Sequence, residues 1–222
     1  MVYRWNFQPL LENPEVLLAG AVGTLRLFVI CLVLGLGSGL VVGLARLAPQ
    51  APLRWLARAF VEFFRNTPVL VQILWFYFAL PILLPVSISP LAAAALGIAL
   101  NSAAFSSEIF RGGIVSIDRG QWEAARALGM NAAQAMRRIV LPQATRRMLP
   151  ALTNRGIEIF KMTTLASAVA YVELLHQGKL LASLNFNPIE TYTVIAIVFF
   201  ILLWPMVQAT YALERRLARV DQ

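Results

Sequence analysis

The sequence predicts an all-α integral membrane protein with five transmembrane helices, an external N-terminus and a cytoplasmic C-terminus. Apolar residues make up 59% of the 222 residues and charged residues only 14%, whereas an ordinary soluble domain is roughly 45–50% apolar. Long uncharged runs recur along the chain, and the basic residues lie in blocks between them. A chain of this length holds about five or six spans of roughly 20 residues. We therefore expect residues 1–222 to form a single transmembrane domain.

The composition also excludes several kinds of chemistry. A single cysteine, Cys31, and a single histidine, His176, are too few for a four-ligand metal site or a disulfide. Neither lysine, Lys161 or Lys179, is followed by the serine or threonine of a phosphate-binding loop. We expect no catalytic site, no metal site and no cofactor bound by this chain.

The first span is expected over residues 20–45, because no charge interrupts the chain from Leu27 to Ala45. Its glycines at positions 35, 39 and 43 have the four-residue spacing that lets membrane helices approach closely. The alternative is that these glycines have no role in packing and are present because membrane helices generally tolerate glycine.

The second and third spans are expected over residues 62–82 and 90–112. The uncharged stretch between Arg65 and Glu108 is too long for one span, and prolines at positions 81, 85 and 90 interrupt it. The stretch therefore predicts two helices joined by a proline-rich turn.

The last two spans are expected over residues 149–173 and 190–214. The latter contains the uncharged run 191–213, whereas the former carries three charges, at Arg155, Glu158 and Lys161. A charge at the centre of a membrane helix costs about 2.5–3.5 kcal/mol on insertion scales. We therefore expect the charged helix to face protein or a water-filled path.

The distribution of charge predicts the orientation of the chain. Residues 46–65 carry four arginines against one glutamate, and residues 108–150 carry seven arginines against three acids. The intervening loops are poor in basic residues, and a basic tail at Arg215, Arg216 and Arg219 follows the last span. The positive-inside rule places the basic segments in the cytoplasm. Because the basic residues adjoin span ends, the net charge of +8 indicates topology and not nucleic-acid binding.

The cytoplasmic segment 118–142 predicts two short helices separated by Gly129. Asp118 and Gln121 have the spacing of a capping box, and Asn131 and Gln134 repeat that spacing after the glycine. We expect a folded helix-Gly-helix element in place of a flexible loop.

This segment resembles the E-A-A-x3-G-x9-I-x-L-P motif of the membrane subunits of bacterial ATP-binding cassette (ABC) importers. The motif positions are filled by Glu123, Ala124, Ala125, Gly129, Ile139, Leu141 and Pro142. Segments 65–72, 107–114 and 141–144 are also similar to the polar amino acid permeases, a branch that includes the histidine, glutamine, arginine and glutamate/aspartate systems.

The resemblance implies a permease subunit in the bacterial inner membrane, without enzymatic activity of its own. Two such subunits, identical or paired with a sister permease, would sit on two P-loop ATPase subunits that bind ATP and Mg, and an extracytoplasmic binding protein would deliver the substrate. Segment 118–142, including Leu128, would then be the loop that couples to the ATPase. On this interpretation Ala124 and Ala125 keep its surface small enough to enter a groove, and Glu123 offers a charged contact at the rim. We call segment 118–142 the coupling loop below.

Seven side chains are candidates for the substrate path. The charged pairs are spaced three residues apart and therefore share a helix face, and an intramembrane charge is a functional hypothesis by default. The candidates are Glu108, Arg111, Arg155, Glu158, Lys161, Thr163 and Thr164. The alternatives are that Glu108 and Arg111 pair with each other near the cytoplasmic end, and that the threonines bond their own backbone. For Asn101 and Ser102 the same two alternatives are open, contact with substrate or hydrogen bonds to their own helix.

The substrate cannot be transferred from the family, because segment 160–165 departs from the family pattern L-K-D-T-S-L. The usual aspartate is Met162, and Arg155 stands where many relatives have an acid. Loss of an anion and gain of a cation disfavour a cationic substrate, so we expect an acidic or amide amino acid. The alternative function is a gradient-driven secondary transporter or channel that needs no ATPase, which would leave the coupling-loop motif unexplained.

Overall fold

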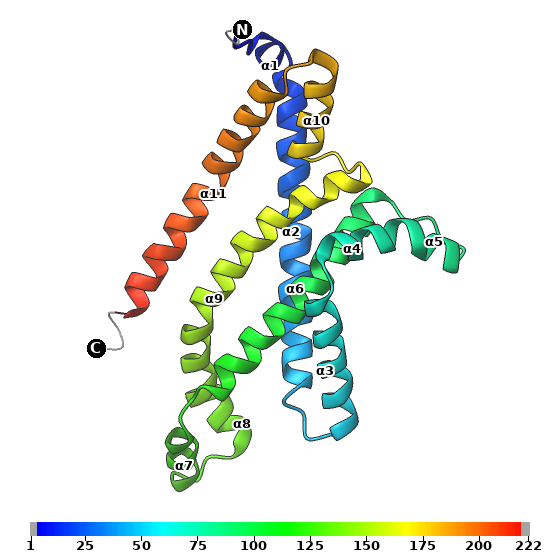
Figure 1. Ribbon diagram of the computed structural model, residues 1–222. Coiled ribbons are helices and arrows are strands. Elements are labelled where there is room, and N and C mark those ends of the chain that lie inside the picture. The colour runs from blue at the N-terminus through cyan, green and yellow to red at the C-terminus, as the bar shows by residue number, and fades with distance from the viewer. Residues whose placement is uncertain (1–3, 219–222) are drawn as a thin grey trace. The chain divides into compact units, whose positions relative to one another are not determined.

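The computed structural model describes residues 4–218, which form helices and no strand (Figure 1). The all-α class expected from the sequence is therefore confirmed over this part of the chain. Arg219, counted above in the basic tail, lies outside these residues.

Four long helices make up most of the fold (Figure 1). They are α2 (Pro14–Ala45), α6 (Pro90–Val115), α9 (Leu141–Met162) and α11 (Pro188–Ala218). By length and composition, α2, α6 and α11 qualify as candidate membrane spans within the described residues, and a bent helix pair beginning with α3 raises the count to four. The number of five spans stays a prediction, because α9 carries the charges noted above.

Shorter helices connect the long ones. They are α1 (Gln8–Glu12), α3 (Ala51–Asn66), α4 (Val69–Leu74), α5 (Leu80–Leu83), α7 (Arg119–Ala127), α8 (Ala132–Ala135) and α10 (Leu174–Asn185). Two π-helical segments, Trp75–Ala79 and Met136–Val140, and a 3₁₀ helix, Thr163–Val169, continue α4, α8 and α9 respectively.

Two predicted spans are not single α-helices. Residues 62–82 are interrupted where α3 ends at Asn66 and α4 begins after Pro68, because a proline lacks an N–H and disfavours a helical conformation of the preceding residue. In residues 149–173, the α-helix ends at Met162, and the following 3₁₀ helix is closed by Ala170 in the left-handed conformation at φ 56°.

The chain groups into two compact units. The first comprises Met1–Val33, Thr67–Ala99 and Ile157–Val207. Its core is built from α2, α4, α6, α9 and the 3₁₀ helix, and the buried apolar side chains include Leu27, Ile73, Ile98 and Ile159. Gly23 is required in this packing, because a Cβ there would lie 1.9 Å from the carbonyl oxygen of Val172.

The second unit comprises Leu34–Asn66, Leu100–Gly156 and Gln208–Gln222. Here α2 and α6 cross at two glycines. A Cβ at Gly39 would lie 2.7 Å from the Cβ of Ser106, and one at Gly43 would lie 2.9 Å from the carbonyl oxygen of Ser107. The close approach predicted from the glycine spacing is therefore confirmed for these two positions.

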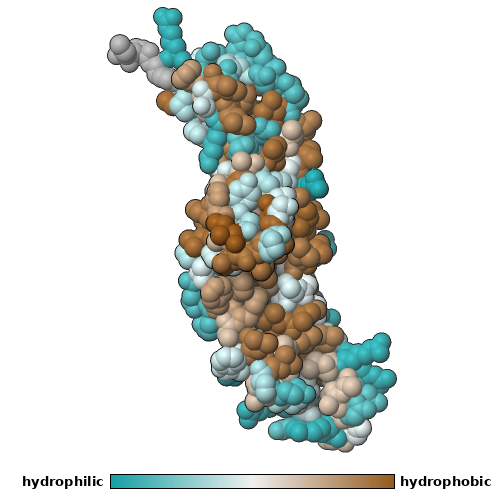
Figure 2. All heavy atoms as spheres, turned by 90° about the vertical axis from the view of Figure 1, so that its right-hand side faces the viewer, coloured by the Kyte–Doolittle hydropathy of each residue, from teal (hydrophilic) through white to brown (hydrophobic). Residues whose placement is uncertain are grey.

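Large apolar side chains remain exposed on the helices, and brown spheres make up much of the surface in Figure 2. On α11, for example, Ile197 is 52%, Phe200 65% and Trp204 54% exposed. Only 11% of the most apolar 18-residue stretch of this helix is buried. Such a surface is expected of a helix that faces lipid.

Candidate functional site: the coupling loop and the charged residues of the long helices

The coupling loop stands on a packed apolar base in the second unit. Ile114 and Ile117 near the end of α6 pack with Val140, Ala144 and Met148, which lie on the π-helical segment after α8 and on α9. Figure 1 shows α7 and α8 beside the ends of α6 and α9. The base gives the loop a fixed position relative to the two helices that it joins.

Polar contacts reinforce this base. Arg147 donates hydrogen bonds from Nη1 to the carbonyl oxygen of Ser116 over 2.5 Å and to its hydroxyl over 3.4 Å. Gln143 donates from Nε2 to Oε1 of Gln121 over 3.2 Å. The start of α9 is thus joined to the end of α6 and to α7.

Helix α7 begins at a capping residue, as predicted, but the cap differs in detail. The Asp118 carboxylate accepts a hydrogen bond from the backbone N–H of Gly120 over 2.6 Å. The side chain of Gln121 accepts from Gln143. The capping box expected between Asp118 and Gln121 is therefore replaced by a simple N-cap, because Gln121 is engaged with α9.

Helix α7 ends in a Schellman motif at Gly129. The N–H of Met130 donates to the carbonyl of Ala125 over 3.0 Å, and the N–H of Gly129 donates to that of Arg126 over 2.9 Å. Gly129 has φ +73°, which a residue with a Cβ adopts only with strain. The predicted break at Gly129 is confirmed.

The second helix begins with the predicted capping box. Asn131 Oδ1 accepts from the N–H of Gln134 over 2.9 Å, and Gln134 Oε1 accepts from the N–H of Asn131 over 3.0 Å. Together with the Schellman motif, the box fixes both sides of the turn between α7 and α8.

The motif residues of the coupling loop differ in exposure. Glu123, Ala124 and Gly129 are exposed, and Leu128 is 78% exposed. Ala125 is fully buried, so the expectation that it keeps the outer surface small is corrected. Ala125 faces the interior of its own chain because α7 packs its apolar side inward. In the remainder of the motif, Leu141 and Pro142 are exposed and Ile139 is half-buried.

The surroundings of the loop are basic. An open pocket beside α8 is lined by Asn131, Ala133, Gln134, Arg137 and Arg138. Glu123 is therefore an exposed anion in a predominantly cationic region of the second unit.

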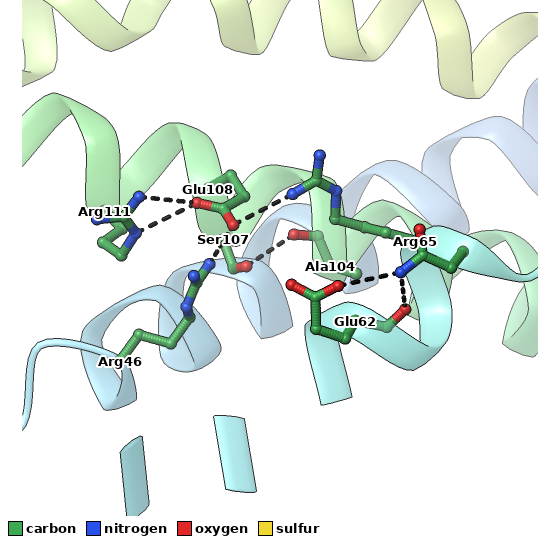
Figure 3. Close-up of polar contacts among 8 residues, drawn as sticks. Arg46, Glu62, Arg65, Ala104, Ser107, Glu108 and Arg111 are labelled. Carbon is green, nitrogen blue, oxygen red and sulfur yellow. Dashed lines mark hydrogen bonds and ion pairs between the residues drawn. The ribbon is translucent and has the colours of Figure 1, made fainter. Parts of the chain in front are cut away.

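Glu108, a predicted substrate-path residue, is the centre of an ion-pair cluster (Figure 3). Its carboxylate lies 2.6 Å from Nη1 of Arg46, 3.2 Å from Nη1 of Arg65 and 3.2 Å from Nη2 of Arg111. Glu108 and Arg111 pair with each other, which is the alternative left open above. Because the cluster joins the end of α2, the end of α3 and α6, it ties three helices of the second unit together.

Arg155, the second charged candidate, is buried within the second unit. Its Nη2 donates to Oδ1 of Asn101 and to Oγ of Ser102, each over 3.1 Å. The guanidinium also lies over the ring of Phe105, 4.6 Å from its centroid. Asn101 and Ser102, which sequence alone left ambiguous, thus serve as partners of Arg155.

The remaining candidates lie in the first unit. Glu158 and Lys161 are exposed. The hydroxyl of Thr163 donates to the carbonyl of Phe160 over 2.7 Å, and that of Thr164 donates to the carbonyl of Lys161 over 2.8 Å. The two threonines therefore bond their own helix, which is the alternative left open above, and their hydroxyl oxygens remain as acceptors.

Sequence reasoning missed three residues of these networks, Arg46, Arg65 and Phe105. Phe105 contacts both Arg155 and Arg65, whose guanidinium lies 5.2 Å from the ring centroid. Arg46 and Arg65 each border an uncharged run, which is the signal that marks them. Their convergence on Glu108 depends on helix packing, which the sequence does not display.

Comparison with known proteins places these features in a family. The profile of a family described as "Binding-protein-dependent transport system inner membrane component" matches residues 20–219. The glutamine transport system permease protein GlnP of Escherichia coli is 37% identical over 202 residues, which cover 90% of this chain and 92% of GlnP. The arginine transport system permease protein ArtQ of Bacillus subtilis is 31% identical over 216 residues, which cover 97% of this chain and 99% of ArtQ.

A solved structure is also similar over nearly the whole chain. The crystal structure of an amino acid ABC transporter with histidines superposes with a TM-score of 0.90 at 31% sequence identity. The match covers 96% of this chain and 100% of the solved chain.

Proposed function

Because this chain belongs to the family of binding-protein-dependent transport system inner membrane components, we propose that it carries polar amino acids as the transmembrane subunit of an ATP-driven importer. The chain is a permease subunit and not an enzyme. ATP hydrolysis lies with a separate ATPase subunit, and ATP and Mg belong there. In this assembly the permease forms the translocation path and receives the motion of the ATPase through the coupling loop.

The single observation that carries the proposal is the construction of the coupling loop. A Schellman motif at Gly129 and a capping box at Asn131 fix the turn, and the buried base holds α7 and α8 to two long helices. A rigid element of this kind transmits a displacement, whereas a flexible tether would absorb it. Glu123, Ala124 and Leu128 lie on its exposed side, where we place the contact with the ATPase.

The experiment that tests the proposal is purification of the tagged chain from its native membrane in mild detergent. Mass spectrometry then identifies the proteins that accompany it. The variant is Glu123→Arg, which reverses an exposed charge without altering Gly129 and its left-handed turn. The matched control is Glu12→Arg, which reverses an exposed charge in α1.

We expect a phosphate-loop ATPase to accompany the wild-type chain and the Glu12→Arg control, and to be reduced or lost with Glu123→Arg. A second permease in the sample would identify the partner as a sister chain, and its absence would indicate two identical copies. Failure of the folded wild-type chain to retain any ATPase, under conditions that preserve such complexes, would contradict the proposal and favour gradient-driven transport.

We further propose that the chain lies in the bacterial inner membrane with its coupling loop in the cytoplasm. The charge distribution of the loops supports this orientation. Cys31 is buried, so single cysteines are introduced by Leu128→Cys in the coupling loop and by Ser87→Cys at an exposed position of the turn between α5 and α6. A membrane-impermeant maleimide applied to intact spheroplasts is expected to label position 87 and not 128, and the reverse pattern would overturn the orientation.

For the substrate, we propose an acidic or amide amino acid, delivered by an extracytoplasmic binding protein. Support comes from the apolar Met162 at the position where the family pattern has an aspartate, next to the exposed cation Lys161. Uptake of labelled glutamate or glutamine, competed by the other, is the expected result. Uptake of labelled lysine or arginine that excess glutamate does not reduce would contradict it.

A further inference from the structure

The turn between α10 and α11 holds a phenylalanine in an unfavourable backbone conformation, and the side chain is not buried against its own chain. Phe186 has φ 52° and ψ 34°, in the left-handed region, and its side chain is 91% exposed. A left-handed conformation is unfavourable for a residue with a Cβ, and glycine or asparagine is the usual choice. Here asparagines flank the phenylalanine at positions 185 and 187, yet the phenylalanine occupies the strained position.

The turn is held firmly by polar contacts within the first unit. Asn185 donates from Nδ2 to the carbonyl of Leu181 over 3.0 Å. On the other side of the turn, Thr191 donates from Oγ1 to Oδ1 of Asn187 over 3.1 Å. The conformation that projects Phe186 is therefore anchored at both ends.

The N-terminal segment packs on the same turn, as Figure 1 shows for α1. The N–H of Asn6 donates to Oε1 of the buried Glu190 over 2.7 Å, and Asn187 donates from Nδ2 to the carbonyl of Asn6 over 3.5 Å. Trp5 and Phe7 flank Asn6 and stack on each other with ring centroids 5.6 Å apart. The contacts at Asn6 thus bring two further aromatic rings to the region of the turn.

The exposed apolar side chains of these segments form a set that we call the anchor surface. Its exposed fractions run from 38% to 91%. The set comprises Trp5, Phe7, Leu11, Leu184, Phe186 and Ile189. Several large apolar side chains exposed together indicate an interaction site, whereas single ones do not.

The depth of the anchor surface follows from α11. Its uncharged run 191–213 spans about 34 Å at 1.5 Å per residue, which matches a hydrocarbon core of about 30 Å. Phe186 precedes the run by five residues, of which only residues 188–190 are helical. These three residues add about 5 Å beyond the run, so the turn lies within the polar headgroup layer. Ile189, the second residue of α11, is exposed and belongs both to the anchor surface and to the exposed apolar face of α11.

We propose that the anchor surface binds the phospholipid bilayer itself, with Phe186 and Leu184 inserted into the headgroup layer above the acyl chains. Insertion removes the exposed aromatic and aliphatic surface from water, which offsets the backbone strain at Phe186. Continuity with the apolar face of α11 selects lipid as the occupant over a soluble protein partner. The surface fixes the external end of α11 at a defined depth in the membrane.

The test uses the full chain in nanodiscs of phosphatidylcholine with bromine atoms near the top of the acyl chains. An environment-sensitive fluorophore is attached to Leu184→Cys, which leaves Phe186 intact. The matched control is the same label at Leu128→Cys, a position of similar exposure, 78% against 74%. We expect brominated lipid to reduce the fluorescence at position 184 and to leave position 128 unchanged.

The second variant adds Phe186→Asn to the labelled chain. Asparagine relieves the strain, so this variant is expected to fold and yet to lose most of the quenching by brominated lipid, with increased quenching by aqueous iodide. A wild-type label that iodide quenches and brominated lipid does not would overturn the proposal. A label protected from both quenchers would also overturn it, because a protein partner or a second copy would then cover the surface.

Discussion

Arg155 donates a hydrogen bond from Nη2 to Oδ1 of Asn101 over 3.1 Å, and both side chains are buried. Asn101 in turn donates from Nδ2 to the carbonyl of Phe64 over 2.8 Å. One amide therefore links α9 to α6 and to the end of α3. It satisfies a buried cation and a carbonyl at the end of a helix, groups that are expensive to leave unpaired.

Replacement of Asn101 by alanine is expected to reduce the free energy of unfolding by about 2–3 kcal/mol, because a hydrogen bond to a buried charge is lost and the Phe64 carbonyl loses its donor. Equilibrium unfolding in detergent micelles measures the change. The double variant Asn101→Leu, Arg155→Met should recover part of the loss, since it removes the charge together with its acceptor. Equal losses for the single and double variants would show that Arg155 does not depend on Asn101.

Glu108 is expected to stabilise the second unit through its three arginines. Glu108→Gln leaves Arg46, Arg65 and Arg111 close together without their shared anion and should lower the free energy of unfolding by about 1–2 kcal/mol. Glu62→Gln is the matched control, because Glu62 contacts Asn66 on its own helix, and it should change stability by less than about 0.5 kcal/mol. Thermal unfolding in detergent at low and high salt compares the two. Identical midpoints would refute the role given to the cluster.

Gly23 and Gly37 lie on the same helix, and substitution by alanine is expected to have opposite effects on stability at the two positions. Gly23→Ala places a Cβ 1.9 Å from the carbonyl oxygen of Val172 and should destabilise the chain by about 3 kcal/mol or more. Gly37→Ala meets nothing within 4 Å and should be neutral or stabilising by up to about 1 kcal/mol, from the higher helix propensity of alanine. Yield of folded protein after size-exclusion chromatography and the unfolding midpoint would show the contrast, and a similar loss for both would argue against the packing at Gly23.

The capping box of the coupling loop gives a local prediction. Asn131→Ala removes the acceptor of the Gln134 N–H and should destabilise α8 by about 1 kcal/mol, whereas Asn131→Asp keeps an acceptor and should remain near wild type. Amide hydrogen exchange of the peptide that contains Gln134 and Ala135 measures the effect. Unchanged protection in the alanine variant would show that the base of the loop, and not the cap, holds α8.

Ala170 offers a test of backbone strain away from the anchor surface. It ends the 3₁₀ helix with φ 56°, and its side chain is exposed. Ala170→Gly should raise the free energy of unfolding by about 0.5–1 kcal/mol, because relief of the left-handed strain exceeds the extra freedom that glycine gives the unfolded chain. A destabilised glycine variant would mean that the methyl group makes contacts worth more than the strain.

Several features of the fold followed from the sequence because they depend on neighbouring residues. The break at Gly129 and the box of Asn131 with Gln134 are local hydrogen-bond patterns, and a spacing of three residues specifies them. The ion pair of Glu108 with Arg111 is likewise a consequence of helical spacing. Where local patterns competed with packing, prediction failed in detail, as at Gln121, whose side chain bonds α9 and leaves Asp118 as a simple cap.

What the sequence alone determined was the membrane class, the importer family and the two ends of the coupling-loop turn, since composition, motif spacing and local backbone bonding are properties of the chain itself. Only the tertiary structure decided what the charged side chains contact. It brought Arg46 and Arg65 to Glu108, enclosed Arg155 among Asn101, Ser102 and Phe105, and turned Ala125 inward. These contacts join residues from different helices, and their geometry is set by how helix faces pack, which no spacing along one segment can encode.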